Sequence, residues 1–413
     1  MPSNRWSRTV QASVLVLVAA SSAEIGFSAG DPGQFGDILK AGKAAISRPK
    51  FTDQDEGRMA QAQAAKFDAE HTMWPEPLLE TYMTGLVQKL VAVAKPRPFP
   101  YRVRVVSDPS LNAFTFGGGM LYIHAGLIAR MENEAQLAMV LGHEIAHVTE
   151  RHVTRGIESA YTTQLVVGGV VTAGASTGII PTGQMLDVAY KSTLDAAVNG
   201  HGRNQEREAD TLGIDYMVKA GYDPREAPIT FELLLKEYGD KGRIATFFYG
   251  SHPNNVERYE TLSKLANGKY AREVKEKRLA VNTEEFKRVT RSVVIATGRL
   301  DYEQARFETA QAMFEKAVRA FQDDPVPHYY LGKIALETGA GDGVDRALKH
   351  LGEAIKADAQ YAPAYRELGL AQYRKGDRPS AITSLERYLA LDPKAEDAKQ
   401  IGSTIEELKR FSR

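Results

Sequence analysis

The chain has 413 residues, of which 43% are hydrophobic and 25% charged, a composition typical of soluble globular proteins rather than of disordered or fibrous ones. Lys plus Arg and Asp plus Glu both number 52, so the chain lacks the basic excess that binds nucleic acid or an anionic membrane surface. The absence of cysteine excludes disulfides and thiolate ligands, and any metal site must be built from histidines and carboxylates.

Residues 1–29 have the order of a secretory signal peptide. Two arginines precede the apolar run 10–20, which is too short to span a bilayer comfortably, and small residues follow it. We expect a cleaved signal peptide, with the cut near Ala23 or Ala29, in preference to an uncleaved membrane anchor. The protein is therefore expected to be exported.

Periodicity and turn residues indicate a mixed region after the signal peptide. Apolar residues at helical spacing predict helices, three prolines at 96–100 end the second one, and alternation around Gly117-Gly118-Gly119 predicts a hairpin. The predicted elements are helices over 56–66 and 78–94, a strand over 101–106, and hairpin strands over 113–116 and 120–123. A small β-sheet among helices gives a fold of the α+β class, mainly α.

The next predicted helix spans 133–154 and contains the main motif of the chain. Asn133, with Gln136 three residues later, forms an N-terminal cap of the capping-box kind. Within the helix, His143 and His147 of the sequence His-Glu-Ile-Ala-His lie four residues apart on one face, where both imidazoles can bind one zinc ion. Glu144 lies beside them and can act on a water at that metal.

A third ligand is expected from the helix predicted over 204–219. A catalytic zinc takes three protein ligands and leaves one position open. Glu206 is the best candidate, and Asp210, on the same helical face, can accept a hydrogen bond from the free N–H of a ligating histidine. His143, His147 and Glu206 thus predict one Zn²⁺ per chain. His152, five residues beyond His147, is expected at the surface.

Two other segments of this region have plainer interpretations. The apolar, glycine-rich stretch 165–184 is read as a buried loop or short core helix in preference to a contact with membrane or substrate, and it is too short and too polar in places for a membrane span. A further helix is predicted over about 254–266.

The last third of the chain indicates helical repeats. Leu331-Gly332 is echoed by Leu368-Gly369, close to the ~34-residue period of tetratricopeptide repeats, which we favour over an unrelated helical bundle. Three helix pairs over 286–391 and a closing helix over 394–411 are expected. The predicted domains are a signal peptide (1–29), a peptidase domain (30–267), a charged connector (268–285) and an all-α tetratricopeptide-repeat domain (286–413).

The motifs together resemble a zincin-type metallopeptidase family of the gluzincin class that includes HtpX, the CAAX prenyl proteases and the mitochondrial Oma-type protease. The shared features are His143 to His147, Glu206 to Asp210, Asn112-Ala113-Phe114, Gly117 to Gly119, and Ser251-His252-Pro253. The resemblance implies zinc ligation by His143, His147 and Glu206, with Glu144 as catalytic base and Asp210 as hydrogen-bond partner of a ligand histidine.

Three positions are left open by the resemblance. His252 either occupies the metal's open position or stabilises the oxyanion, and the alternative is a purely structural role. Gly202 departs from the serine that family members often carry before the arginine matched by Arg203. His201 is read as a loop residue in preference to one that assists the transition state.

The resemblance also implies an activity and a setting. It implies a zinc metalloendopeptidase. Independently of the resemblance, the backbone of the strand predicted over 120–123 could hold an extended substrate that adds to the sheet as a strand. A secreted member with repeats is similar to periplasmic proteases that act in the assembly or quality control of outer-membrane proteins. Expected partners are protein substrates and, through the repeats, the outer-membrane assembly machinery; peripheral membrane contact is compatible with the sequence. The alternative is a repeat-bearing chaperone or interaction protein with incidental or latent proteolysis.

Overall fold

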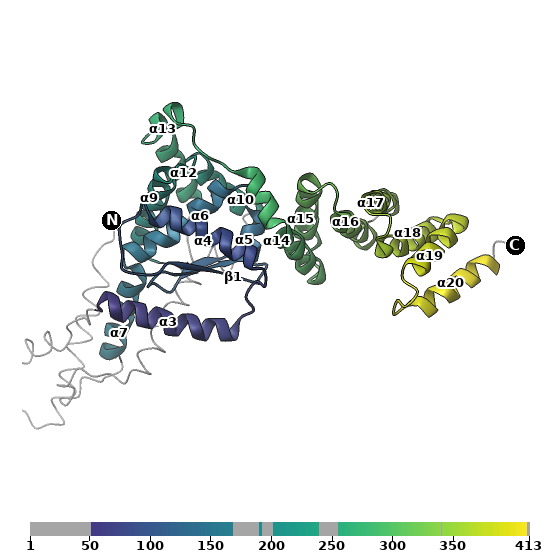
Figure 1. The fold of residues 1–413 in the computed structure, drawn as a ribbon, viewed down its shortest axis with the longest axis horizontal. Helices are drawn as coiled ribbons and strands as arrows, with labels where there is room; N and C mark the ends of the chain where they lie inside the picture. Colours follow the sequence, from purple (N-terminus) through teal and green to yellow (C-terminus); the bar gives the residue numbers. More distant parts are fainter. Residues whose placement is uncertain (1–50, 168–189, 192–200, 239–254, 340, 411–413) are drawn as a thin grey trace, which may run out of the picture. The chain divides into compact units, whose positions relative to one another are not determined.

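The computed structural model describes residues 51–167, 190–191, 201–238, 255–339 and 341–410 (Figure 1). The predicted signal peptide, most of the stretch 165–184 and His252 lie outside the described residues. All contacts given below lie within one compact unit, to which the described residues other than 165–167 belong. Among the described residues, no helix has the length and apolar character needed to cross a membrane.

A three-stranded sheet lies in the peptidase region. Its order is β1 (Arg102–Val106), β3 (Met120–His124), β2 (Ala113–Thr115), with β1 parallel and β2 antiparallel to β3. The predicted hairpin is confirmed, and its three turn glycines have φ values of 76°, 54° and 80°, which favour glycine. Because both edges of β3 are paired, the expected addition of a substrate strand to β3 is wrong, and β1 and β2 are the two outer strands.

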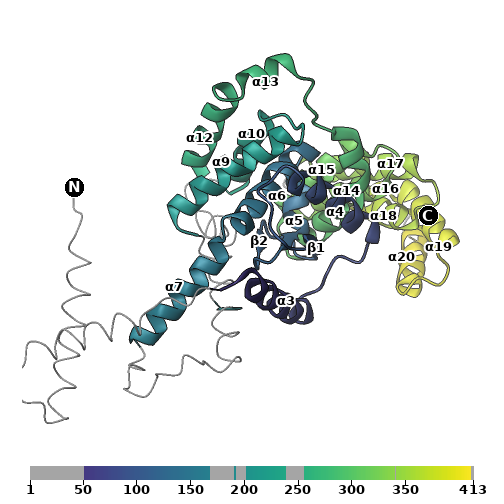
Figure 2. The same ribbon diagram turned by 60° about the vertical axis from the view of Figure 1, so that its left-hand side comes forward.

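Helices cover both faces of the sheet. α3 (Asp53–Glu70) lies along one face, and α4 (Pro77–Val91) and α6 (Glu134–Thr149) cover the other (Figures 1 and 2). Alternation along β3 explains the two layers: Tyr122 packs with the aromatic residues of α3 and the hairpin, whereas Leu121 and Ile123 join the main core with α4 and α6. The short helix α5 (Ala125–Arg130) follows β3 directly.

The predicted helix over 133–154 is divided in two. Asn133 accepts a hydrogen bond from the Gln136 amide at 3.0 Å, as predicted, but the Gln136 side chain accepts from the Glu132 amide, so the capping box is incomplete. α6 ends at Thr149, and α7 (His152–Val167) begins after Arg151, whose φ of 60° is left-handed. The next described helices are α9 (Arg203–Lys219), α10 (Glu226–Tyr238) and α12 (Asn255–Asn267), and the short α13 (Ala271–Glu276) lies in the predicted charged connector.

Three helix pairs and a closing helix form the repeat region, as predicted. They are α14 (Thr283–Glu303), α15 (Phe307–Ala320), α16 (Pro325–Thr338), α17 (Gly343–Ala357), α18 (Ala362–Lys375), α19 (Arg378–Leu391) and α20 (Ala398–Arg410). The repeated glycines have a packing reason. A Cβ atom at Gly332 would lie 2.7 Å from Leu351 Cγ, and one at Gly369 would lie 2.7 Å from Leu385 Cγ.

The first helix pair of the repeats packs into the peptidase core. Phe286 and Val293 of α14 are buried in the same cluster as the residues of α4 and α6. Arg130 of α5 forms a buried ion pair with Asp301 of α14 at 3.0 Å. Lys316 of α15 donates hydrogen bonds to the carbonyl groups of residues 129 and 131 at the end of α5. Helices α14 and α15 therefore contribute to the stability of the peptidase region.

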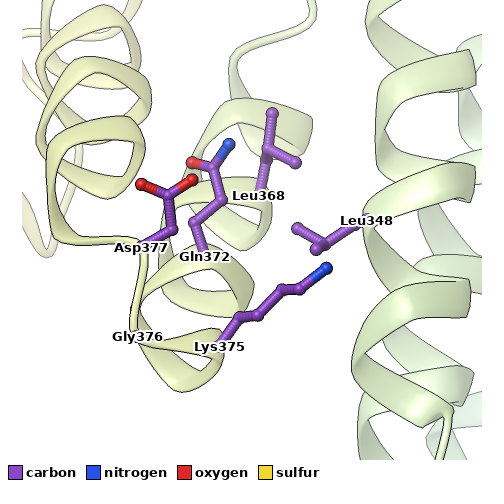
Figure 3. A pocket seen from close by; sticks show the side chains of 6 residues that line it. All are labelled: Leu348, Leu368, Gln372, Lys375, Gly376 and Asp377. Carbon is purple, nitrogen blue, oxygen red and sulfur yellow. The ribbon is translucent and has the colours of Figure 1, made fainter.

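A cavity of about 520 Å³ opens between α17 and α18 (Figure 3). It is lined by Leu348, Leu368, Gln372, Lys375, Gly376 and Asp377. Lys375 pairs with Asp345 at 2.7 Å, and none of the lining side chains belongs to the predicted metal site. The cavity is a feature of the repeats and separate from the chemistry described next.

Candidate metal centre

Two glycines allow the motif-bearing helices α6 and α9 to touch through their backbones. A Cβ atom at Gly213 of α9 would lie 2.9 Å from the backbone nitrogen of His143, and one at Gly142 of α6 would lie 2.9 Å from the Gly213 carbonyl oxygen. Real Cβ atoms do not approach backbone atoms so closely, so only glycine permits this contact. It brings the face of α6 with His143 and His147 against the face of α9 with Glu206.

The three predicted ligands lie together. The Nε2 atoms of His143 and His147 are 2.9 Å apart, and the Glu206 carboxylate oxygens are 3.4 Å from His143 Nε2 and 3.7 Å from His147 Nε2. One donor atom from each residue lies within 4.8 Å of the others, and all three residues are buried. Two imidazoles and a glutamate form a donor set found in catalytic zinc sites. The group fits a divalent metal ion, while its role as ligand set stays a prediction.

Asp210 and Arg258 support His143 on the side away from His147. Asp210 Oδ1 lies 3.0 Å from His143 Nδ1, as predicted for a hydrogen-bond partner. Arg258 of α12 donates to both carboxylate oxygens of Asp210, at 2.8 and 2.5 Å, and its guanidinium lies over the Phe231 ring, 4.3 Å from the centroid. Both Asp210 and Arg258 are buried.

Arg258 was not predicted, although a sequence signal exists. It precedes Leu262 and Ala266 at four-residue spacing, and both of these are buried. A cation on the apolar stripe of a helix needs a buried partner, since an unpaired charge is rarely buried. That spacing could have identified Arg258 as a functional or structural anchor.

Burial and neighbouring charges shift the pKa values of Asp210, His143 and His147, and the direction of the shift differs among the three groups. Burial would raise the pKa of Asp210, but the charge of Arg258 and hydrogen bonds from His143 and Arg258 hold that pKa below its ordinary value. Burial and Arg258 lower the pKa of His143, yet hydrogen bonds to Asp210 and Glu206 raise it to about 9. Burial and neighbouring imidazoles hold the pKa of His147 well below its usual range, which favours the neutral form that binds metal.

The expected surface position of His152 is wrong. His152 is fully buried, its Nδ1 lies 2.9 Å from His147 Nδ1, and its Nε2 lies 3.1 Å from Glu208 Oε2. The left-handed turn at Arg151 is the reason: it ends α6 and redirects the chain, so the five-residue spacing on a continuous helix does not apply. No periodic signal could have found this contact.

Glu144 and His201 complete the described surroundings. Glu144 is buried, and its charge is among those that raise the pKa of Arg258 against the effect of burial. The His201 ring stacks on His147, with centroids 4.1 Å apart and planes 26° apart. A cavity of about 20 Å³ lies between α9 and α12, lined by Arg203, Glu206, Arg207, Asp210, Glu257, Arg258 and Thr261. It has room for about one water molecule.

Comparison with known proteins identifies both regions. Residues 77–266 match peptidase family M48, and residues 295–343 and 339–396 match the tetratricopeptide repeat. The beta-barrel assembly-enhancing protease of Escherichia coli K12 is 35% identical over 170 residues, which cover 39% of this chain and 34% of that protein. The match therefore spans about a third of that relative's length.

Two further relatives are metallopeptidases by name. The mitochondrial metalloendopeptidase OMA1 of Schizosaccharomyces pombe is 29% identical over 224 residues, covering 53% of this chain and 64% of that protein. The metalloprotease LoiP of Escherichia coli K12 is 27% identical over 224 residues, covering 54% and 84%.

These matches confirm the predicted family resemblance and the predicted fold class. Family M48 implies a divalent metal, and tetratricopeptide repeats indicate protein–protein interaction. The chain contains a domain of peptidase family M48, with a candidate metal site at His143, His147 and Glu206, followed by tetratricopeptide repeats.

Proposed function

We propose that the protein is a zinc-dependent endopeptidase whose zinc is held by His143, His147 and Glu206, one ion per chain. The observation that carries the proposal is the convergence of three buried donor side chains from two helices in backbone contact. A buried imidazole pair with a carboxylate is a costly arrangement unless a cation or hydrogen bonds compensate for it. The relatives named as metallopeptidases support the same activity.

Each residue has a separate task in this proposal. A bound zinc ion would polarise the peptide carbonyl and acidify a water molecule. Glu144 accepts the proton of the attacking water and delivers it to the leaving amine. Asp210, itself fixed by Arg258, orients the His143 ring through Nδ1. His252 remains a candidate either for closing the metal's open position or for stabilising the oxyanion.

The sheet offers a place for an extended substrate. β2 is one of the two outer strands of the described sheet and packs against α6, which carries the two histidines. A peptide that adds to this edge would gain main-chain hydrogen bonds and run past the metal site.

We assign the protein to the assembly or quality control of outer-membrane or periplasmic proteins. Three features support this setting: the signal-like residues 1–29, the repeats as a docking surface, and a relative named beta-barrel assembly-enhancing protease. Its substrates would be envelope proteins, and the assembly machinery would be a partner of the repeats. An interaction protein with incidental proteolysis is the second candidate, but Glu144 beside the ligand set favours an enzyme, since a structural zinc needs no general base.

Glu144→Gln tests the enzymatic assignment. We expect the variant to keep its fold and one zinc per chain, and to lose casein hydrolysis by about 10²–10⁴-fold. Glu150→Gln, which changes a glutamate just beyond the end of the same helix, is the control and should keep the parent activity. Unchanged hydrolysis by Glu144→Gln would refute the base assignment.

Two more variants test the metal site and the loop histidine. Glu206→Ala should lose zinc in a metal-content measurement, and undiminished zinc would end the proposed ligand set. For His252→Ala, faster cleavage supports a residue that closes the site, and lost cleavage supports a role in the transition state. Unchanged cleavage removes both roles.

A further inference from the structure

We propose that His152 is a positioning residue for His147, and that Glu208 completes a directed chain of hydrogen bonds to this candidate ligand. The inference rests on the proposed function, because it takes His147 Nε2 as the atom that faces the metal. It adds two residues to the site that lie outside both the His-Glu-x-x-His motif and the ligand set.

The chain of contacts is continuous from the centre of the site to its rim. His147 Nε2 lies 2.9 Å from His143 Nε2 and 3.7 Å from Glu206. On the opposite side of the same ring, Nδ1 lies 2.9 Å from His152 Nδ1. The other nitrogen of His152 lies 3.1 Å from Glu208 Oε2. Both imidazoles are fully buried, whereas the Glu208 side chain is 46% exposed.

The donor and acceptor roles follow from the chemistry of neutral imidazole. A ring that offers its Nε2 lone pair to a metal carries its proton on Nδ1. His147 Nδ1–H then faces His152 Nδ1, and only one of two nitrogens at this distance can carry the proton. His152 Nδ1 is therefore the acceptor, and its own proton is on Nε2. That proton faces the Glu208 carboxylate, so each donor in the chain meets an acceptor.

The arrangement gives the two candidate ligand histidines different supports. His143 is held by the carboxylate of Asp210, which is buried and paired with Arg258. His147 donates instead to the neutral ring of His152. That ring in turn donates to the carboxylate of Glu208 at the surface. Partners of this kind orient a ligand ring and fix its tautomer, and their loss typically weakens metal binding by about 10–100-fold.

Two substitutions of His152 separate positioning from packing. In His152→Asn the side-chain amide occupies the place of Nδ1 and can still accept from His147. In His152→Gln the amide lies one atom further out, near the place of Nε2, and leaves His147 Nδ1–H without its acceptor. Both variants are polar, and Asn leaves more empty volume than Gln, so a packing effect alone would harm His152→Asn more, which is opposite to the result expected for positioning.

The experiment measures the zinc dissociation constant of the full chain by competition with a chromogenic chelator. The absorption spectrum of the Co²⁺-loaded protein and the melting temperature are recorded alongside. We expect His152→Asn to bind zinc within about threefold of the parent, and His152→Gln to bind about 10–100-fold more weakly with an altered Co²⁺ spectrum. His124→Gln is the control. His124 is also buried, contacts Ser110 at 2.8 Å, and should change the melting temperature without changing zinc affinity.

Equal zinc affinities for the Asn and Gln variants would overturn the proposal, whether both match the parent or both fall together with the melting temperature. Glu206→Ala separates this result from the proposed function. If Glu206→Ala loses zinc while the two His152 variants bind equally, the ligand set stands and the His152 chain fails. If Glu206→Ala binds zinc as the parent does, the ligand set and the chain built on it both fail.

Discussion

Replacing Arg258 with leucine is expected to lower the unfolding free energy by about 3–5 kcal/mol, the usual cost of removing one partner from a buried ion pair. Arg258 is 4% exposed and Asp210 2% exposed, so bulk solvent screens the Asp210 charge poorly once the guanidinium is removed. Two hydrogen bonds at 2.8 and 2.5 Å and the contact with Phe231 are lost together. The Asp210 charge is then left with His143 as its main partner.

The measurement is urea unfolding of residues 30–413, which lack the predicted signal peptide, with any metal removed by chelator so that metal binding does not add to the stability. Tryptophan fluorescence reports on the peptidase region, because Trp74 packs against its core and the other of the two tryptophans, Trp6, falls in the signal-like segment. Arg207→Leu is the matched control. Arg207 pairs with Glu257 at 2.5 Å, but both side chains are exposed, and exposed pairs contribute about 0–1 kcal/mol.

A double variant shows whether the buried charge is the cause. Asp210→Asn in the Arg258→Leu background removes the unpaired carboxylate and should recover part of the loss. An Arg258→Leu variant within about 1 kcal/mol of the parent, or a double variant less stable than Arg258→Leu, would refute this reasoning.

Three further predictions concern other parts of the fold. Gly213→Ala should lower the unfolding free energy by about 1–3 kcal/mol and weaken zinc binding, because its Cβ would lie 2.9 Å from the His143 nitrogen. Gly85→Ala is the control, since Gly85 has open space around it. Equal effects of the two substitutions would contradict the helix-contact argument. A chain that ends at residue 285 should aggregate and lose cooperative unfolding. A chain that ends at residue 323 keeps α14 and α15 and should unfold cooperatively. If the shorter chain is soluble and unfolds cooperatively, α14 and α15 are dispensable for the peptidase region. Burial lowers the pKa of both His328 and His350, whose Nδ1 atoms are 3.3 Å apart. The folded state then binds fewer protons than the unfolded state, and stability should fall as pH drops through about 6.5. A variant with both histidines changed to Gln should lose this pH dependence of the melting temperature. An unchanged pH dependence would exclude the pair as its source.

Helices and turns that have a strong local sequence signal were predicted correctly. Apolar periodicity located α4, α9 and α12, and the three turn glycines located the hairpin. The unpredicted helix α10 has Pro228 in its first turn, where proline is tolerated because its missing N–H has no partner there in any case. The position of a proline within an element therefore matters more than its presence.

Features that depend on distant contacts were not predictable in this way. β3 is central because β1 pairs with it in parallel from outside the hairpin, and no local signal specifies that pairing. The end of α6 depends on Arg151 in a left-handed conformation, without a glycine or proline to mark it. His143, His147 and Glu206 could be proposed as ligands because their residue types and spacing match a metal-binding pattern, while the support from His152 and Arg258 depends on contacts outside that pattern.

The contact between Gly142 and Gly213 has a consequence for related sequences of unknown activity. A chain can keep both histidines and the glutamate, yet carry a bulkier residue at either of these two positions. Its α6 and α9 would stand farther apart, and the three donor groups would no longer meet although every motif residue is present. Inspecting these two positions alongside the motif would separate active peptidases from inactive relatives.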